Sequence, residues 1–587
     1  MSSVINFPRD TTLKETNRIL RCLAPLSVQF DGTAEGYKRT MRQWFIDNGA
    51  LDADADQLTA LCDKWYTITR TPWHGWTTFY QPGVSGVSSG TRGGDNVGMV
   101  CEPSTDTFAG RDDFAGLPLF AVVDCNWIID PTTLEKKITA IDGITDNFRR
   151  YSPDYFVGVL QMSGYYGRIE HEDTWEAHYS ALRSVNVPEI APLAEAVRQD
   201  GSVSSWVIHS KYPNHTVDGK LTSYSGVIPT AYSISHNTMH TLSKATGAGY
   251  SGFTSADAAF LKIMVEIIFA SVTLDGIIQG CCNFNVQCIA AESETGVKRV
   301  ILNAADAARL EVGCSVVIGN YTTSSDRYYL HSVTPDGAVI TAIEPHGEGK
   351  VAVYVDVPEP FDTTAGEAAA EGTTYLSTYH WKNGTCDGVL GNNGSYKDNV
   401  SGKYPGKIQG IEYMSGFYTV VSDTLLKYYQ DSDGTYWCEP YVCTDTTKQA
   451  TSITADYKAG SVRIKQPSSN NWCYVVKNGI KNGVSFPINI KGGSSSTYTR
   501  DAVYILGNTA SGIYELLLFC TLNLGIANAG LSGGNANNGP GNVNWNIGGW
   551  NSEIHTKKLF CIARRLRKTA AGGVISAVPT LRGKLNG

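Results

Sequence analysis

The sequence predicts an α+β protein with several domains, and three observations lead to this prediction. The chain has 587 residues, which is long for a single hydrophobic core. Hydrophobic residues make up 42% and charged residues 18%, and glycine occurs 60 times, as in an ordered, loop-rich protein. Helical periodicity marks the first 70 residues, whereas short β-branched runs between Gly and Asp turns mark later segments.

The N-terminal region, residues 1–80, is predicted to form a small helical unit. Leu58, Leu61 and Trp65 follow one another at three- and four-residue steps, as on one face of a helix. Residues 81–116 include the Gly/Ser-rich stretch PGVSGVSSGTRGGDNVG, which is typical of a linker or a long loop. No secretory signal peptide is expected, so the 14 cysteines should be reduced after synthesis in a cytoplasm.

The middle of the chain, residues 117–291, is predicted to mix strands and helices. Runs such as LPLFAVVDCNWII predict strands, and Thr254 with Asp257 forms a capping-box pattern, so a buried amphipathic helix should begin near residue 255. Residues 292–360 contain brief β-branched runs at short intervals, which predict an inserted small antiparallel barrel or sandwich.

The last large domain is predicted over residues 373–560, where short strands, Tyr and Trp alternate with long Asn/Gly loops. Residues 561–587 form a basic tail, which we interpret as solvated or as an assembly contact. The formal charge of −8 over the whole chain argues against a dedicated nucleic-acid binder. The most apolar run, residues 260–282, contains three charged residues, so no membrane insertion is expected.

Several local patterns resemble catalytic or metal-binding motifs, and each has a structural interpretation. Gly86–Gly90 matches GxSxG, but a Gly/Ser-rich loop surrounds it instead of the strand and helix that a nucleophile needs. Asp431 and Asp433 resemble the start of a calcium loop, but the later ligands are missing, so a hairpin turn at Asp433-Gly434 is predicted. His236 and His240 have helical spacing without a third ligand, which favours a structural pair.

Acidic residues crowd the stretch YYGRIEHEDTWEAHY. Glu170, Glu172, Asp173 and Glu176 could supply the two carboxylates of a glycosidase, but clustering in sequence does not show a cleft, so a solvated face is predicted. Neither a phosphate-binding loop nor a dinucleotide fingerprint occurs. We therefore expect no enzymatic activity, no catalytic residue, no metal site and no cofactor.

The segment GNANNGPGNVNWNIGGWN, residues 534–551, is the most unusual part of the chain. Seven of its residues are Asn and two are Trp, and none is charged. Rigid aromatic rings and small polar side chains are enriched in binding loops. The composition therefore favours an ordered binding surface, with an aromatic-rich core and ordinary loops as the alternative.

Four blocks of sequence resemble a known family, and they read ADAAFLKIMVEIIFASVTLDGIIQG, YHWKNGTCDGVLGNNGS, GKYPGKIQGIEYMSGFYTVVSDTLL and NNGPGNVNWNIGGWN. Together they resemble the C-type-lectin-like, formylglycine-generating-enzyme-like domain of bacteriophage tail and receptor-binding proteins. Several of those proteins are targets of diversity-generating retroelements. The resemblance covers residues 225–290 and 373–560, and this chain has Tyr413, Met414 and Phe417 where Asn, Trp and Asn are usual.

The resemblance implies short strands and two helices that hold long loops, with ligand contacts near the C-terminal end. In retroelement targets, mutagenesis acts at adenines of AAY codons, so Asn positions mark variable, ligand-facing sites. The receptor-binding residues carried over to this chain are Asn535, Asn537, Asn538, Asn542, Asn544, Trp545, Asn546 and Trp550. Enzymatic relatives use a cysteine pair with copper, but Cys520 and Cys561 do not match that motif.

The resemblance thus implies a bacteriophage tail-tip or tail-fibre adhesin in the virion, whose partners are a host-cell glycan or surface protein and other tail proteins. The N-terminal region would dock to the virion, and a homotrimer would gain strength through avidity. Retroelement diversification of the C-terminal domain is a further expectation. Two alternatives stay open at this point: a structural baseplate, collar or capsid-decorating protein, and a surface-polysaccharide depolymerase that uses the acidic cluster near Glu170.

Overall fold

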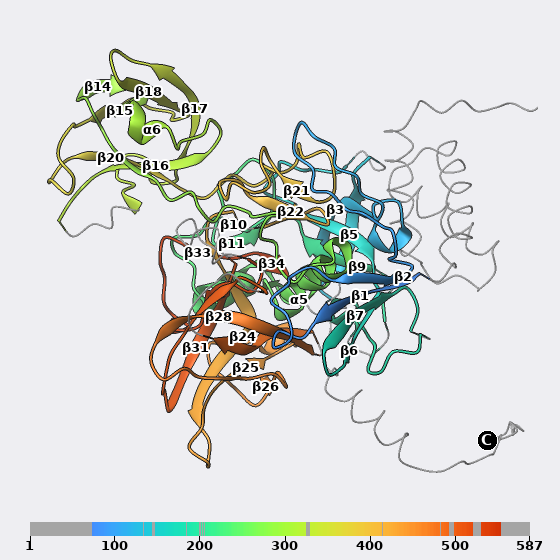
Figure 1. Cartoon of the computed structure of the whole chain (residues 1–587). Helices are drawn as coiled ribbons and strands as arrows, with labels where there is room; N and C mark the ends of the chain where they lie inside the picture. Colours follow the sequence, from blue (N-terminus) through green and yellow to red (C-terminus); the bar gives the residue numbers. More distant parts are fainter. Residues whose placement is uncertain are drawn as a thin grey trace, which may run out of the picture.

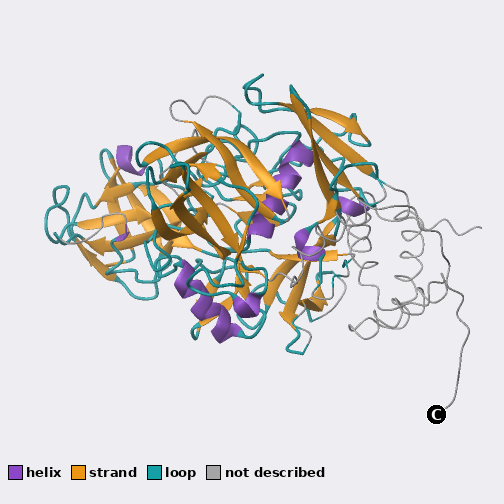
Figure 2. Cartoon of the chain, turned by 90° about the horizontal axis from the view of Figure 1, so that it is seen from below, coloured by secondary structure: helices purple, strands orange, loops and turns teal. Residues whose placement is uncertain are grey.

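The computed structural model describes residues 73–552, except for 133, 135, 144–146, 184, 199–200, 202, 205, 324–328, 414, 482, 492–497 and 520–529. Most of the predicted helical region 1–80 and the whole basic tail 561–587 therefore lie outside the described residues. Helix accounts for 9% and strand for 40%, and several antiparallel sheets include a curled half-barrel sheet (Figure 2). The multidomain prediction is confirmed, but the protein is mainly β, which corrects the α+β class.

Two antiparallel sheets form the N-terminal part of the described chain. A five-stranded sheet has the order β2-β1-β7-β6-β8 and a four-stranded sheet the order β4-β3-β5-β9. The strands of the first are β1 (His74–Tyr80), β2 (Thr91–Gly94), β6 (Tyr165–Glu170), β7 (Thr174–Ser180) and β8 (Ala191–Pro192). Those of the second are β3 (Val122–Ile129), β4 (Lys136–Ile141), β5 (Phe156–Met162) and β9 (Trp206–Ser210). The end of the predicted helical region is thus strand β1.

The predicted helix near residue 255 is confirmed as α5 (Ser255–Met264). The Thr254 side chain accepts from the Asp257 backbone N–H, and the Asp257 side chain accepts from the Thr254 N–H, which completes the capping box. All ten residues of α5 are buried, and Figure 1 places the helix in the centre of the main body. A π-helix (Val265–Phe269) continues α5 and ends at Ala270, which has a left-handed φ of 48°.

A lobe built from residues 287–378 stands apart from the main body in Figure 1. Its main sheet has the order β13-β20-β16-β17-β18-β15, and β14 pairs with β19 beside it. We call this unit the insertion lobe. Its elements are β13 (Gln287–Ile289), β14 (Glu294–Val297), β15 (Arg299–Asn303), α6 (Ala304–Ala307), β16 (Ser315–Asn320), β17 (Ala338–Pro345), β18 (Lys350–Val355), β19 (Phe361–Thr363) and β20 (Thr374–Thr378).

The C-terminal part of the body is one ten-stranded sheet. Its order is β26-β25-β24-β31-β32-β30-β28-β29, with β27 paired to β25 and β33 paired to β24. The strands are β24 (Tyr418–Gln430), β25 (Tyr436–Val442), β26 (Lys458–Ala459), β27 (Ile464–Lys465), β28 (Asn471–Lys481), β29 (Val484–Lys491), β30 (Ala502–Ile505), β31 (Ser511–Leu518), β32 (Gly534–Asn535) and β33 (Ile547–Gly548). The hairpin predicted at Asp433-Gly434 is confirmed between β24 and β25.

Short elements complete the body. The strands are β10 (His215–Val217), β11 (Lys220–Thr222), β12 (Ser251–Gly252), β21 (Gly394–Ser395), β22 (Gly406–Ile408), β23 (Ile411–Tyr413) and β34 (Asn551–Ser552). The remaining helices are α4 (His236–Thr246) and the 3-10 turns Pro118–Phe120, Ala194–Ala196 and Thr446–Lys448. No helix among the described residues is long and apolar enough to cross a membrane.

Two hydrophobic cores hold the body and the insertion lobe. The larger core packs α5 against strands of the five-, four- and ten-stranded sheets and includes Phe79 and Trp550, which are far apart in sequence. The second core lies in the insertion lobe and extends into the body through Trp381 and Trp545. The segment that was predicted to bind a receptor therefore contributes one indole ring to each core.

Candidate functional site

The segment 534–552 is anchored in sheets at both ends. β32 pairs with β31 and β30, β33 pairs with β24, and β34 pairs with β12. Between β32 and β33 the chain leaves the sheet, and we call residues 536–546 the Asn loop. Because three short strands hold its flanks, the loop is a fixed feature of the ten-stranded sheet and not a tail.

The two tryptophans of this segment lie inside the protein. Trp545 is 6% exposed and Trp550 is 2% exposed. The Trp550 ring packs edge-on against Phe253, with ring centroids 5.1 Å apart, and the Trp545 ring stacks over His380 at 6.0 Å. In this structure both tryptophans that were predicted as receptor contacts are core residues, and their rings hold the flanks of the Asn loop in place.

His380 fixes the end of the Asn loop that carries Trp545. Its Nε2 lies 2.7 Å from the Trp545 carbonyl oxygen, and its Nδ1 lies 3.0 Å from the Gly416 carbonyl oxygen. Burial lowers the pKa of His380 to about 4, so the ring is neutral at pH 7 and its single N–H can donate to only one of these carbonyls. A buried neutral histidine thus joins the loop to the turn before β24.

The predicted Asn residues differ in exposure. Asn542 and Asn544 are exposed together with Val543, which is 50% exposed. The other predicted positions are half-buried, and they are Asn535, Asn537, Asn538 and Asn546. Among the described residues, the Asn542 side chain makes no hydrogen bond, whereas Asn544 Oδ1 accepts from the Trp545 backbone N–H at 2.7 Å. The exposed part of the predicted site is therefore residues 541–544.

Half-buried residues of the loop are held mainly by backbone hydrogen bonds. The Glu515 N–H donates to the Asn538 carbonyl at 2.8 Å, and the Tyr418 N–H donates to the Asn546 carbonyl at 2.7 Å. Asn535 Oδ1 accepts from the Asn537 N–H at 3.0 Å. Substitution of these side chains would leave most of the backbone contacts in place, because the bonds use main-chain atoms.

The N-terminal end of helix α4 contacts the Asn loop and the strand beside it. Its Asn237 N–H donates to the Pro540 carbonyl at 2.9 Å, and its first N–H, at His236, donates to the buried Glu515 carboxyl at 2.9 Å. Burial raises the pKa of Glu515 to about 8. Glu515 of β31 thus contacts the N-terminus of α4 with its carboxyl group and the Asn loop with its backbone N–H.

The histidine pair predicted on this helix faces the interior. His236 and His240 are buried, with their Nε2 atoms 3.3 Å apart. Burial lowers the pKa of His236 to about 3 and that of His240 to about 4. No group of three or more His, Cys, Asp or Glu side chains that could hold a metal ion occurs among the described residues. The pair therefore serves packing in the part of the chain that is described.

The remaining predicted motifs have structural contacts. Ser88 donates its hydroxyl to the Tyr498 carbonyl, and no base lies at hydrogen-bond distance from it among the described residues. Asp431 and Asp433 both accept from the Thr435 N–H in the β24–β25 hairpin. The interpretation of these aspartates as a hairpin turn is confirmed, and the Ser88 loop leads into strand β2.

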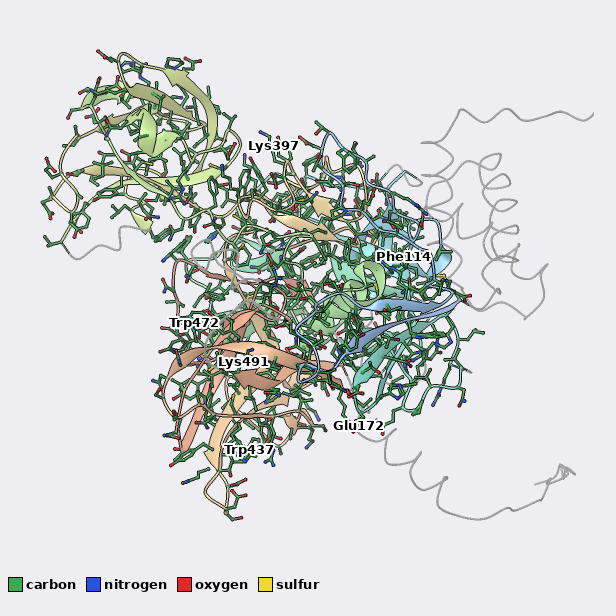
Figure 3. The ribbon with its side chains drawn as sticks, in the orientation of Figure 1. Phe114, Glu172, Lys397, Trp437, Trp472 and Lys491 are labelled. Carbon is green, nitrogen blue, oxygen red and sulfur yellow. The ribbon has the colours of Figure 1, made fainter. Side chains whose placement is uncertain are left out.

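The acidic stretch forms the end of the β6–β7 hairpin, where Glu172 is exposed (Figure 3). Glu170 accepts from Lys477 at 2.6 Å, and Glu176 lies 2.8 Å from His178 Nε2. A cavity of about 30 Å³ lies nearby, lined by Glu266, Asp501 and other residues. Neither Glu170 nor Glu176 lines this cavity, so the cavity does not bring together two carboxylates of the acidic stretch as a glycosidase requires.

An ion cluster joins four separate segments of the body. Arg150 lies 2.7 Å from Asp124 and 3.5 Å from Asp387, and Lys211 lies 3.1 Å from Asp124. The Tyr212 hydroxyl donates to Asp387 at 2.7 Å. We call these residues the Arg150 cluster. The sequence analysis missed it because its members are far apart and follow no known motif.

Two other residues near the site were missed for different reasons. Glu515 is the only charge in the apolar run IYELLLF, and a lone charge in a buried strand was a usable signal for a structural or functional role. Asn237 had no such signal, since its contact with the loop depends on how α4 packs against β24 and β31. Comparison of the sequence with protein-family models and with curated proteins finds no match.

Proposed function

We propose that the chain is a bacteriophage tail-tip or tail-fibre adhesin that binds a host-cell receptor through the exposed residues 541–544 of the Asn loop. The observation that carries the proposal is an exposed, uncharged Asn/Gly loop whose flanks are fixed by three strands and two buried tryptophans. The sequence resemblance to phage receptor-binding proteins supports the same function.

The loop has the properties that a binding surface needs. An amide side chain both donates and accepts hydrogen bonds, so Asn542 and Asn544 can meet hydroxyl or peptide groups of a receptor. Buried Trp545 and Trp550 restrict the loop before binding, which lowers the entropic cost of association. The tryptophans thus contribute to binding indirectly, by positioning the asparagines.

Affinity from so few polar contacts would be low for one copy. A homotrimer attached to the virion through its N-terminal region would present three loops and would gain avidity if all three reach the cell surface. We extend the proposal to diversification of the Asn codons by a retroelement. A reverse-transcriptase gene beside a near-copy of this coding segment that differs at adenines would support that extension.

A structural virion protein is the second candidate, because one exposed apolar pair favours a subunit contact. Phe108 is 55% exposed and Leu390 is 58% exposed, and their loops are joined by a hydrogen bond from the Leu390 N–H to the Thr105 carbonyl. Neighbouring exposed apolar side chains are typical of interaction surfaces. The depolymerase alternative gains no support from the small cavity near Glu266.

Cell binding tests the adhesin function directly. Fluorescently labelled full-length protein would be added to a panel of Gram-negative and Gram-positive bacteria, together with the double variant Asn542→Ala/Asn544→Ala. We expect saturable binding to some species and at least a tenfold loss for the double variant, since hydrogen bonds at a binding interface are each worth about 1 kcal/mol or more.

Asn489→Ala is the matched control, because Asn489 is also exposed but lies on β29, away from the Asn loop. It should bind cells like the unchanged protein. Equal binding by the double variant would contradict the assignment of the site. Absence of binding to every species, with incorporation of the protein at a buried position of the virion, would favour the structural candidate.

A further inference from the structure

Stacked aromatic rings reach the surface where the insertion lobe meets the body. Tyr232, from the segment before α4, stacks on Tyr329 of the insertion lobe with centroids 5.4 Å apart and planes 25° apart. Tyr329 in turn stacks on His331 at 4.1 Å. Tyr232 is 41% exposed, so part of this residue is accessible to solvent beside the stacked contact with Tyr329. We call Tyr232, Tyr329 and His331 the aromatic ladder.

Ring contacts connect the aromatic ladder to the Asn loop through the interior. Tyr329 stacks on the buried Tyr379 at 5.5 Å, Tyr379 lies 4.0 Å from His380, and His380 stacks on Trp545. Trp545 is the residue that follows the exposed Asn544. The ladder and the loop therefore belong to one continuous packed unit, although they come from three separate segments of the chain.

The backbone also limits the distance between the ladder and the loop. Tyr232 lies five residues before Asn237, and the Asn237 N–H donates to the Pro540 carbonyl of the Asn loop. Five residues span at most about 18 Å even when fully extended. Tyr232 therefore lies within about 21 Å of the Pro540 carbonyl in the Asn loop, a distance that an oligosaccharide of several sugars can span.

The chemistry of this combined surface favours a neutral ligand. Residues 530–552 contain no charged side chain, and they present amides and backbone groups. Burial raises the pKa of Tyr329, and the exposed Asp336, a charged neighbour among the described residues, acts in the same direction. An anionic ligand would be repelled by Asp336 and would find no cation in the Asn loop.

A neutral sugar matches both halves of the surface. Its ring has an apolar C–H face that can lie on the open face of a tyrosine, and its hydroxyls can pair with amides that both donate and accept. We infer that the Asn loop and Tyr232 together bind a neutral oligosaccharide, with Tyr232 as the stacking platform. This inference rests on the proposed function and names the class of receptor.

A glycan array tests the inference. The full-length protein would be applied to neutral oligosaccharides of glucose, galactose, mannose, rhamnose and N-acetylglucosamine, and to matched oligosaccharides that carry a uronic acid. We expect binding to at least one neutral oligosaccharide and weaker binding to its acidic counterpart. Tyr232→Ala should weaken binding about tenfold, whereas Tyr232→Phe, which keeps the ring, should bind within about twofold of the unchanged protein.

Tyr80→Ala is the control, because Tyr80 is 50% exposed at the end of β1 in a different sheet. It should bind the array normally, and melting temperatures would confirm that all variants fold. Binding to cells without binding to any neutral oligosaccharide would overturn the inference, and so would an unchanged Tyr232→Ala variant. If the full-length protein bound no bacterial species at all, the proposed function itself would fail, which separates the two outcomes.

Discussion

The Asn loop and the Arg150 cluster both bring polar side chains together where several segments meet, but the side chains differ in their exposure to solvent. In the loop, uncharged amides are exposed and the aromatic rings beside them are buried. In the cluster, fully charged groups are buried and paired with one another, with Asp124 and Lys211 each 7% exposed at the side chain. The amides of the Asn loop can therefore still form hydrogen bonds with a partner, whereas the charged groups of the Arg150 cluster already bond to one another inside the fold.

The difference shows which polar groups can serve binding. A buried charge that loses its ion-pair partner is strongly destabilised, because it no longer has water or an opposite charge around it. The members of the Arg150 cluster therefore cannot exchange their partners in the fold for a ligand. An exposed amide is hydrated in the free protein and exchanges water for a ligand at little cost. The charged residues thus hold the sheets together, and the neutral ones are free to vary.

Removal of an anchor under the loop should have the largest effect. Trp550→Ala would empty the space between Phe253 and Phe519, and a truncation of this kind in a core costs about 3–5 kcal/mol. Thermal unfolding followed by circular dichroism should show a clear fall in melting temperature. A melting temperature equal to that of the unchanged protein would mean that Trp550 is not a core residue in solution.

Breaking the Arg150 cluster should destabilise the body somewhat less. Arg150→Met would take one ion-pair partner from Asp124 and would remove the link to Asp142, for a loss of about 3 kcal/mol. Arg111→Met is the matched control, since Arg111 makes an equally short ion pair with Asp113 but its side chain is 60% exposed. Urea denaturation should separate the two variants, and equal midpoints would contradict a special role for burial.

Helix α5 and the two buried tryptophans show why only part of the fold could be predicted from the sequence. Helix α5 was predictable because its capping box and apolar spacing lie within about fifteen residues of one another. The burial of Trp545 and Trp550 was not, because Asn/Gly segments have no periodicity and the rings pack on Phe253 and His380 from distant segments. Composition therefore could not show that the two tryptophans of this segment are buried, and the receptor-binding role of the segment stays a prediction.

The class of the fold was misjudged for a related reason. Residues 117–291 were predicted to mix strands and helices, whereas most of their elements are strands, and some of these pair with distant partners, such as β12 with β34. The Arg150 cluster could not be predicted because Asp387 and Arg150 are 237 residues apart in the sequence and follow no local pattern. Long-range pairing, which local patterns do not encode, decided both outcomes.

The buried Glu515 should give the protein a pH dependence at the loop. Its pKa is raised from 4.5 to about 8, so the folded state keeps a proton that the unfolded chain releases, and stability falls as the pH rises from about 4.5 to 8. Glu515→Gln removes this contribution and should melt a few degrees higher than the unchanged protein at pH 8.5. The two should differ little at pH 4, where the glutamate is protonated in both states.

The fall in stability at acidic pH serves as an internal control for that experiment. His236 and His240 are neutral in the folded state with pKa values of about 3 and 4, so stability falls as the pH drops below 6.5, where the unfolded histidines bind protons. Glu515→Gln should keep this fall unchanged. Parallel melting curves for both proteins across the whole range from pH 4 to 9 would show that Glu515 does not titrate as its burial requires.

The smallest effect on stability should come from a substitution in the exposed part of the Asn loop. Asn542→Ala changes a side chain that makes no hydrogen bond with the described residues, so differential scanning calorimetry should find its stability within about 0.5 kcal/mol of the unchanged protein. Asn544→Ala removes the contact with the Trp545 N–H and should cost slightly more. A loss above about 2 kcal/mol for Asn542→Ala would mean that this amide supports the fold. A neutral result beside a large loss of cell binding would place the function of the loop in the side chains that the fold does not need.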